Sequence, residues 1–231
     1  MSTKHDFSST DPRVQIFAID SQTFKSAAQT ITELINNSID QYQTANVIIS
    51  SGNAISQTLG CLSTNTIDWQ KVNWFLADER CVAANDPESN QLQITKVLEK
   101  SLGEKYGTVI APDTRRAPEK AVAGYASRIA SISMFNFCLL GMGNDGHIAS
   151  LLPQHSALSS NESCCLVTDS PNPPSERITM TLKTFARISS RILVTVGAAK
   201  NEAIKNYVAD PRTPVRLFNP TIIFSDRAAY Q

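Results

Sequence analysis

One stretch of the sequence combines glycines with residues that can transfer protons. Residues 137–153 read FCLLGMGNDGHIASLLP, so an apolar run ends in a glycine-rich turn at Gly143 that is followed by Asp145 and His147. Glycine lets a backbone approach a ligand closely, and ligands of open α/β sheets bind beyond the carboxyl ends of strands. An imidazole can accept a proton near neutral pH, which makes His147 a candidate general base for activating water. The stretch alone also fits a tight turn beside an unrelated histidine.

The residues around His147 have two possible roles each. Asp145 can orient the imidazole or bind substrate hydroxyls, and it can equally accept local backbone hydrogen bonds as a turn residue. Backbone N–H groups between Gly143 and Gly146, or a nearby cation, are candidates for stabilising an oxyanion. The sequence contains no Gly-x-Ser-x-Gly motif that would make His147 part of a serine triad.

A second candidate site is the turn at Ser51, Gly52 and Asn53, which follows a short β-branched run and opens a predicted helix. The free N–H groups and the dipole at a helix N-terminus suit a phosphate. The same residues also suit an ordinary helix N-cap.

Two cations follow other predicted strands. Arg80 offers a fork that binds phosphate or carboxylate, and its alternative role is an ion pair with Asp78 or Glu79. Lys200 falls in the first turn of a predicted helix, where a cation is unfavourable unless an anion lies near. Both residues are therefore candidates for binding an anionic substrate.

Hydrophobic periodicity predicts an alternation of strands and helices along the chain. Such an alternation indicates an α/β fold with a mainly parallel sheet and helices on both faces. We expect Ser89 to cap one helix and residues 170–174 to form a surface loop. Residues 177–189 are a mixed segment that is not assigned to a single strand or helix. The predicted strands are residues 14–19, 46–50, 72–77, 135–140, 164–168, 192–196 and 221–224, and the predicted helices are residues 21–39, 54–62, 89–102, 118–133 and 198–208.

The candidate residues all follow predicted strands, in residues 50–53, 78–80, 141–147 and 197–200. The carboxyl ends of parallel strands lie along one edge of a sheet. We therefore expect these four loops to converge on one pocket.

Composition narrows the class of protein. The 231 residues are 42% hydrophobic, with 21 basic and 21 acidic residues, so no global charge would attract nucleic acid. Five cysteines without metal-ligand spacing fit a reduced, cytoplasmic protein, and no apolar segment is long enough to span a membrane. We expect a flexible N-terminal tail over residues 1–12 and a single α/β domain over residues 13–231, with the oligomeric state left open and a monomer plausible.

These motifs resemble those of the 6-phosphogluconolactonases, whose nearest relatives in fold are the glucosamine-6-phosphate deaminases. The resemblance implies a Rossmann-like fold without a nucleotide cofactor, and hydrolysis of a sugar-phosphate lactone in the pentose phosphate pathway. We expect no metal, because a lactone is already an activated ester. It also implies that His147 is the general base and that Arg80 and Lys200 bind the substrate phosphate. The matching segments are GMGNDGHIASLLP at residues 141–153, DERCV at 78–82 with Ser89-Asn90, RITMT at 177–181, GAAK at 197–200 and DRAA at 226–229.

One segment departs from the family pattern. The family usually has Ser-Gly-Gly-Ser-Thr-Pro where this chain has SSGNAI at residues 50–55, so Ser51 replaces a glycine and Ala54 replaces a hydroxyl donor. This departure leaves a non-catalytic sugar-phosphate-binding protein as an alternative. A sugar-phosphate isomerase or deaminase is another, although Arg80 and the run at residues 150–153 favour the lactonase. The sequence also leaves open whether Arg177 contacts substrate or braces the fold.

Overall fold

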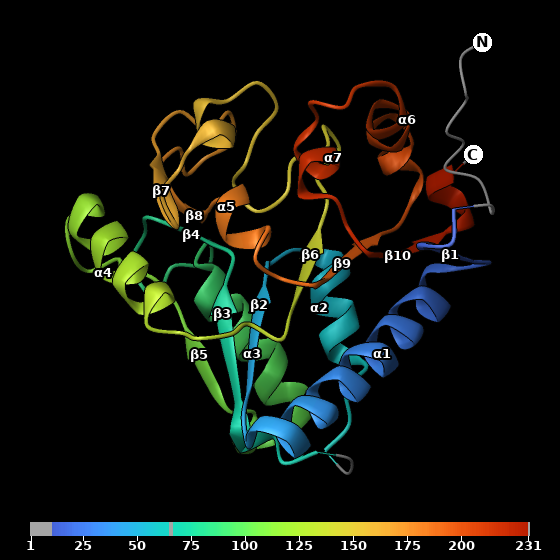
Figure 1. Ribbon diagram of the computed structural model, residues 1–231, viewed down its shortest axis with the longest axis horizontal. Coiled ribbons are helices and arrows are strands. Elements are labelled where there is room, and N and C mark those ends of the chain that lie inside the picture. The colour runs from blue at the N-terminus through green and yellow to red at the C-terminus, as the bar shows by residue number, and fades with distance from the viewer. Residues whose placement is uncertain (1–10, 65–66, 231) are drawn as a thin grey trace.

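The computed structural model describes residues 11–64 and 67–230. Most of the predicted N-terminal tail therefore lies outside the described residues, and the division into a tail and one domain stays a prediction. The predicted α/β fold class is confirmed, because seven strands form one parallel sheet (Figure 1). In spatial order the strands are β1 (Val14–Phe17), β10 (Ile222–Asp226), β9 (Ser190–Thr195), β6 (Phe137–Gly141), β2 (Ala45–Ile49), β3 (Val72–Leu76) and β5 (Thr108–Ile110).

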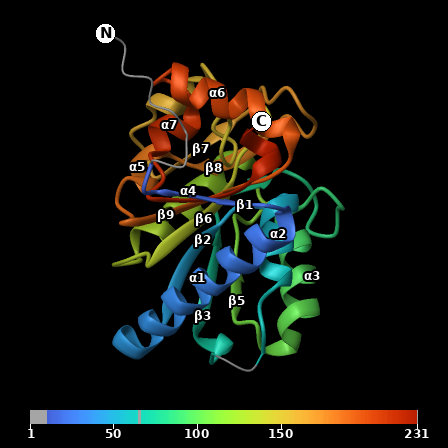
Figure 2. The same cartoon turned by 90° about the vertical axis from the view of Figure 1, so that its right-hand side faces the viewer.

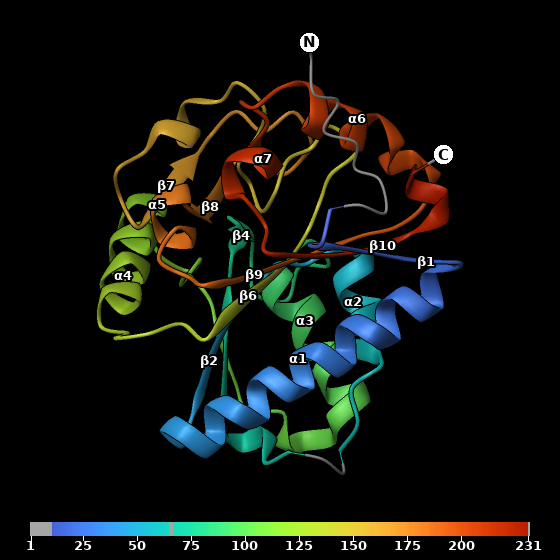
Figure 3. The ribbon, with the colours of Figure 1, turned by 45° about the vertical axis from the view of Figure 1, so that its right-hand side comes forward.

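Helices cover both faces of this sheet. Figure 2 shows one group of helices below strands β1 and β9, with α6 and α7 of the other group above them, and Figure 3 shows the same arrangement after a smaller turn. The first group is α1 (Asp20–Tyr42), α2 (Asn53–Gly60) and α3 (Asn90–Leu102), and the second is α4 (Pro118–Ala130), α5 (Leu182–Phe185), α6 (Asn201–Ala209) and α7 (Pro214–Phe218). Short 3-10 turns complete the described elements: η1 (Trp69–Lys71), η2 (Gly103–Lys105), η3 (Ser156–Ser159), η4 (Ala198–Lys200) and η5 (Arg227–Tyr230).

The core lies in two layers because successive residues of a strand point to opposite faces. In β2, Val47 and Ile49 pack with residues of α1, α2 and α3, whereas Ile48 packs with residues of α4. All three side chains are fully buried. A parallel strand covered on both faces is apolar throughout, which is why β2 reads as a continuous apolar run.

A second, antiparallel sheet carries part of the pocket. Its strands, in spatial order, are β4 (Asp78–Arg80), β8 (Arg177–Met180) and β7 (Cys164–Val167). Ala77 joins the two sheets, since its N–H donates to Ile49 O at 2.7 Å and its carbonyl accepts from Met180 N at 2.7 Å. The prediction that residues 78–80 form a loop was wrong, because pairing with β8 makes them a strand.

None of the helices in the described residues combines the length and the apolar character that crossing a membrane requires.

Candidate active site

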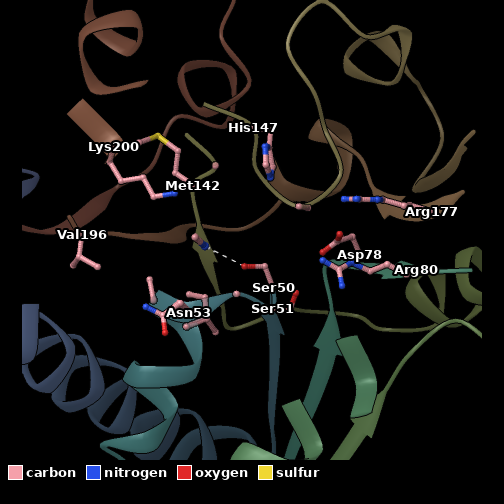
Figure 4. Close-up of a pocket in the computed structure, with 16 residues that line it drawn as sticks. Ser50, Ser51, Asn53, Asp78, Arg80, Met142, His147, Arg177, Val196 and Lys200 are labelled. Atoms are coloured by element: carbon pink, nitrogen blue, oxygen red, sulfur yellow. Dashed lines mark hydrogen bonds between the residues drawn. The ribbon is translucent and has the colours of Figure 1, made fainter. Parts of the chain in front are cut away.

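A pocket of about 270 Å³ lies at the carboxyl edge of the large sheet, beside the small sheet. The predicted convergence of four strand ends on one pocket is confirmed, and β8 contributes a fifth segment (Figure 4). Asp145 contacts His147 but does not line the pocket. The predicted site residues that do line it are Ser51, Gly52, Asn53, Arg80, Gly143, His147, Arg177 and Lys200.

The imidazole of His147 points into this pocket (Figure 4) and forms a hydrogen bond with Asp145. The distance from His147 Nδ1 to Asp145 Oδ1 is 2.6 Å, and the backbone N–H of His147 donates to the same oxygen at 3.1 Å. Asp145 therefore acts both as a turn residue and as the group that orients the imidazole. Burial alone would raise the pKa of Asp145, but the hydrogen bond and charge of His147 hold it at about 2. An ionised carboxylate can only accept, so Nδ1 is the donor in this hydrogen bond, and in the neutral imidazole the lone pair is then on Nε2.

Gly143 leaves room for the imidazole of His147. A Cβ at this position would lie 2.1 Å from His147 Nδ1 and 2.7 Å from Asp145 Oδ1. The loop also uses its own donors, since Gly143 N–H donates to His147 O at 2.8 Å and Gly146 N–H donates to Gly143 O at 3.1 Å. Both of these N–H groups are engaged within the loop, so neither of the two is free for an oxyanion.

Beyond the histidine, a tight turn connects the glycine loop to the small sheet. Ala149 lines the pocket with a positive φ of 47°, a conformation that a residue with a Cβ rarely adopts. The turn directs the fully buried Ser150 toward β4, where its hydroxyl donates to Asp78 Oδ2 at 2.7 Å. Sequence reasoning assigned no role to Asp78 or Ser150 in the site. Their positions inside matching motifs were the available signal.

Arg80 and Arg177 are direct cross-strand partners in the small sheet. Arg80 Nη1 donates to the carbonyl of Glu88 at 2.7 Å and to its carboxylate at 3.3 Å, so the ion pair is not with Asp78 or Glu79. Arg177 Nε donates to Pro174 O at 3.0 Å, and burial followed by the charge of Arg80 lowers the pKa of Arg177. Like charges directly opposite each other destabilise a strand pair, and an anion bound between them would relieve that repulsion.

Lys200 stands on the other side of the pocket from Arg80 (Figure 4). It ends η4 and precedes α6, and its Nζ donates to Asn144 Oδ1 at 2.7 Å. Burial lowers the pKa of Lys200, which a bound anion would oppose. The cation thus contacts the glycine loop while facing the pocket.

The turn that departs from the family pattern keeps the geometry of a helix N-terminus. Gly52 has a φ of 107° and precedes the first residue of α2, Asn53, whereas Ser51 is not among the residues with positive φ. The glycine that the turn requires is therefore present. The Ser51 hydroxyl donates to Asn90 Oδ1 at 2.6 Å and is engaged within the protein.

Glu79 is a structural residue that sequence reasoning left without a role in the site. Its buried carboxylate accepts the backbone N–H groups of Arg80, Asn90 and Gln91, each at 2.7 Å. Burial raises the pKa of Glu79, and these N–H groups work against that rise. Glu79 thereby attaches the strand that carries Arg80 to the N-terminus of α3.

The family described as "Glucosamine-6-phosphate isomerases/6-phosphogluconolactonase" matches residues 19–224 of the sequence. The chain belongs to this family. The match includes every segment that lines the pocket, so the predicted family resemblance is confirmed.

Several members of the glucosamine-6-phosphate isomerase/6-phosphogluconolactonase family are similar along most of their length. "Probable 6-phosphogluconolactonase 1" of Arabidopsis thaliana is 33% identical over 86% of this chain and 85% of its own. "Probable 6-phosphogluconolactonase 2" of Oryza sativa subsp. indica is 30% identical over 94% of this chain and 88% of its own.

Solved structures share the fold. A 6-phosphogluconolactonase from Shewanella baltica has a TM-score of 0.83 at 24% identity, covering 92% of this chain and 97% of its own. A monomeric glucosamine-6-phosphate deaminase has a TM-score of 0.82 at 18% identity, covering 94% of this chain and 98% of its own. The fold is thus common to lactonases and deaminases and does not by itself separate the two reactions.

Proposed function

We propose that this chain hydrolyses 6-phospho-D-glucono-1,5-lactone to 6-phospho-D-gluconate in the oxidative pentose phosphate pathway. The observation that carries the proposal is a histidine with one nitrogen held by a carboxylate and the other free, inside a pocket flanked by cations. The curated relatives named as 6-phosphogluconolactonases support the same activity.

The substrate phosphate is proposed to bind above the turn at Gly52 and Asn53. The first N–H groups of a helix have no intrahelical partners, and together with the helix dipole they favour an anion at the start of α2. Lys200 and Arg80 flank this turn from opposite sides of the pocket (Figure 4). A phosphate between them would satisfy both cations, and Ser51 would contribute through its backbone because its hydroxyl is engaged.

With the phosphate held there, the lactone carbonyl would face His147. Nε2 of His147 takes a proton from water while the water oxygen attacks C1. Asp145 keeps the ring in the required tautomer and stabilises the imidazolium that forms. The geometry therefore suits proton transfer without a covalent enzyme intermediate.

The negative charge that develops on the C1 oxygen needs a donor that the glycine loop does not offer from Gly143 or Gly146. Arg177 points toward the centre of the pocket in Figure 4, and its guanidinium is fixed by the carbonyls of Pro174 and Asn172. We assign to Arg177 the stabilisation of this oxyanion. When the tetrahedral intermediate collapses, the C1–O5 bond breaks and the imidazolium of His147 returns its proton to the departing ring oxygen.

A coupled assay with freshly generated 6-phosphogluconolactone, corrected for spontaneous hydrolysis, tests this proposal. Wild-type protein should accelerate hydrolysis, and His147→Ala should lose about 10²-fold or more of kcat, the typical contribution of a general base. His155→Ala is the matched control, because His155 does not line the pocket. Turnover of His147→Ala near that of the wild type would remove the general-base assignment.

The same assay separates the alternatives. A non-catalytic binding protein would be stabilised by 6-phosphogluconate without accelerating lactone hydrolysis. A deaminase would release ammonia from glucosamine 6-phosphate and leave the lactone untouched. The His147 and Asp145 pair favours catalysis over binding alone, since binding a phosphate needs no oriented base.

We further place the activity in the cytoplasm. In the described residues all five cysteines are free thiols, which suits a reducing compartment. A relative in Arabidopsis thaliana is named "6-phosphogluconolactonase 3, chloroplastic", so fractionation of the source cells should decide the location.

A further inference from the structure

A buried asparagine joins the two elements to which we assign phosphate binding. Asn90, the first residue of α3, has no exposed surface. Its Nδ2 donates to Asp78 O at 2.9 Å, and its Oδ1 accepts the hydroxyl of Ser51 at 2.6 Å. One amide therefore connects the turn before α2 to the strand that carries Arg80.

The bond to Ser51 exists because this chain departs from the family pattern. A glycine at position 51 would supply no hydroxyl, and the backbone there has no positive φ that would demand a glycine. Compared with a glycine, the serine restricts the backbone at position 51. It also adds a hydrogen bond to Asn90, which lies 39 positions later in the sequence. The neighbouring Ser50 is tied on the other side, since its Oγ accepts Gly141 N–H at 3.0 Å.

We propose that Ser51 and Asn90 are a positioning pair that fixes the turn at Gly52 relative to Arg80, so that the two parts of the phosphate site hold one geometry. The inference rests on the proposed phosphate site. Neither side chain of the pair needs to touch the substrate. Their effect is on how well the turn and the arginine are preorganised to receive one phosphate.

Removing the hydroxyl tests the pair. Ser51→Ala should raise KM for the lactone about fivefold, which corresponds to one net hydrogen bond. Its kcat should stay within about twofold of wild type, because His147 and Asp145 are held by bonds within their own loop. Ser51→Gly should raise KM further, because it also frees the backbone of the turn.

A matched control removes a similar bond far from the site. Ser38 is buried in α1, and its hydroxyl donates to Leu34 O at 2.7 Å. Ser38→Ala should leave KM unchanged, and a Tm for Ser51→Ala close to that of Ser38→Ala would exclude general unfolding as the cause of a raised KM.

A double-mutant cycle separates pairing from independent effects. If the two side chains act together, Asn90→Ala and Ser51→Ala combined should raise KM no more than Asn90→Ala alone. If Asn90→Ala does not fold, the single Ser51 variants and their control decide the question.

Three results would contradict the proposal that Ser51 and Asn90 act as a positioning pair. They are an unchanged KM in Ser51→Ala, a loss confined to kcat in that variant, and effects on KM that multiply in the double variant. The proposed function would survive any of these results if the wild type hydrolyses the lactone and His147→Ala does not. Absence of wild-type lactonase activity would instead remove the function on which the pair rests.

Discussion

The His147 and Asp145 pair depends on a position that has no side chain. A methyl group at residue 143 would lie 2.1 Å from Nδ1 of His147, closer than any real contact. Gly143→Ala should therefore rotate or displace the imidazole, and a misplacement of about 1 Å is enough to lower kcat by about 10²-fold. Steady-state kinetics with the lactone measure the effect.

Gly124→Ala is the control for that substitution. Gly124 lies within α4, and a Cβ there would meet nothing within 4 Å. Alanine in a helix interior should stabilise the protein by about 0.5–1 kcal/mol, with kcat unchanged. Full activity in Gly143→Ala would show that the loop can move away without moving the histidine.

Lys200 should make binding of the phosphate weaken as the pH becomes alkaline. Because burial lowers the pKa of Lys200, its charge is lost as pH rises through a value below that of an exposed lysine. The phosphate stays fully ionised over this range, so the affinity for 6-phosphogluconate should fall at alkaline pH, before an exposed lysine would lose its charge. Calorimetric titration of the product measures this dependence.

Lys200→Arg removes the titration and keeps the charge. Its affinity for 6-phosphogluconate should be flat over the same pH interval, even if it is lower throughout. An equal alkaline loss in both proteins would assign the dependence to another group.

At the scale of elements, strand β4 is placed by tertiary contacts rather than by its own sequence. Three charged residues have no apolar alternation, so Asp78, Glu79 and Arg80 read as a loop. Their backbone pairs with β8, and Glu79 holds them against α3. The three-residue β5 was unpredicted for the same reason, since so short a strand carries no period of its own.

Longer elements were predictable because their apolar spacing is sustained. The expected helix at residues 89–102 is observed as α3, and Ser89 accepts Leu92 N–H at 3.2 Å as its predicted cap. The loops that carry His147 and Lys200 could be located as strand ends. The bond from Ser150 to Asp78 could not be predicted, because it joins residues 72 positions apart.

Glu79 should contribute to stability through its backbone bonds. Glu79→Gln replaces one acceptor oxygen by an amide that would face N–H donors, which should destabilise the protein by about 2 kcal/mol. Urea denaturation measures the free energy of unfolding. Because β4 carries Arg80, KM should rise in the same variant.

The control is an exposed glutamate in the first turn of another helix. Glu119 occupies that position in α4, and Glu119→Gln should change the free energy of unfolding by no more than about 0.5 kcal/mol. Equal effects of the two substitutions would mean that the buried bonds of Glu79 contribute nothing specific.

At the scale of the whole molecule, the pocket forms where two sheets meet. The large parallel sheet supplies the ends of β2, β6 and β9, and the small antiparallel sheet supplies Arg80 and Arg177. Ala77 connects the two sheets, and the bond from Ser150 to Asp78 connects the loop after β6 to the small sheet. A ligand that contacts all these segments should therefore stabilise both sheets together.

Hydrogen exchange with and without 6-phosphogluconate measures that coupling. At about 100 times Kd the ligand should stabilise the folded state by about 2.7 kcal/mol, and protection should rise at residues 50–54, 78–82, 141–150 and 196–200. At the opposite edge of the large sheet, Asn73 Nδ2 donates to Asn46 Oδ1 at 3.0 Å. Protection there should rise only by the amount that stabilisation of the whole folded state produces. A second cavity between α4 and the loop after β5 is lined by Asp113, Lys120 and Arg128. If protection rose only in the backbone amides that surround this second cavity, the ligand would bind outside the site that contains His147.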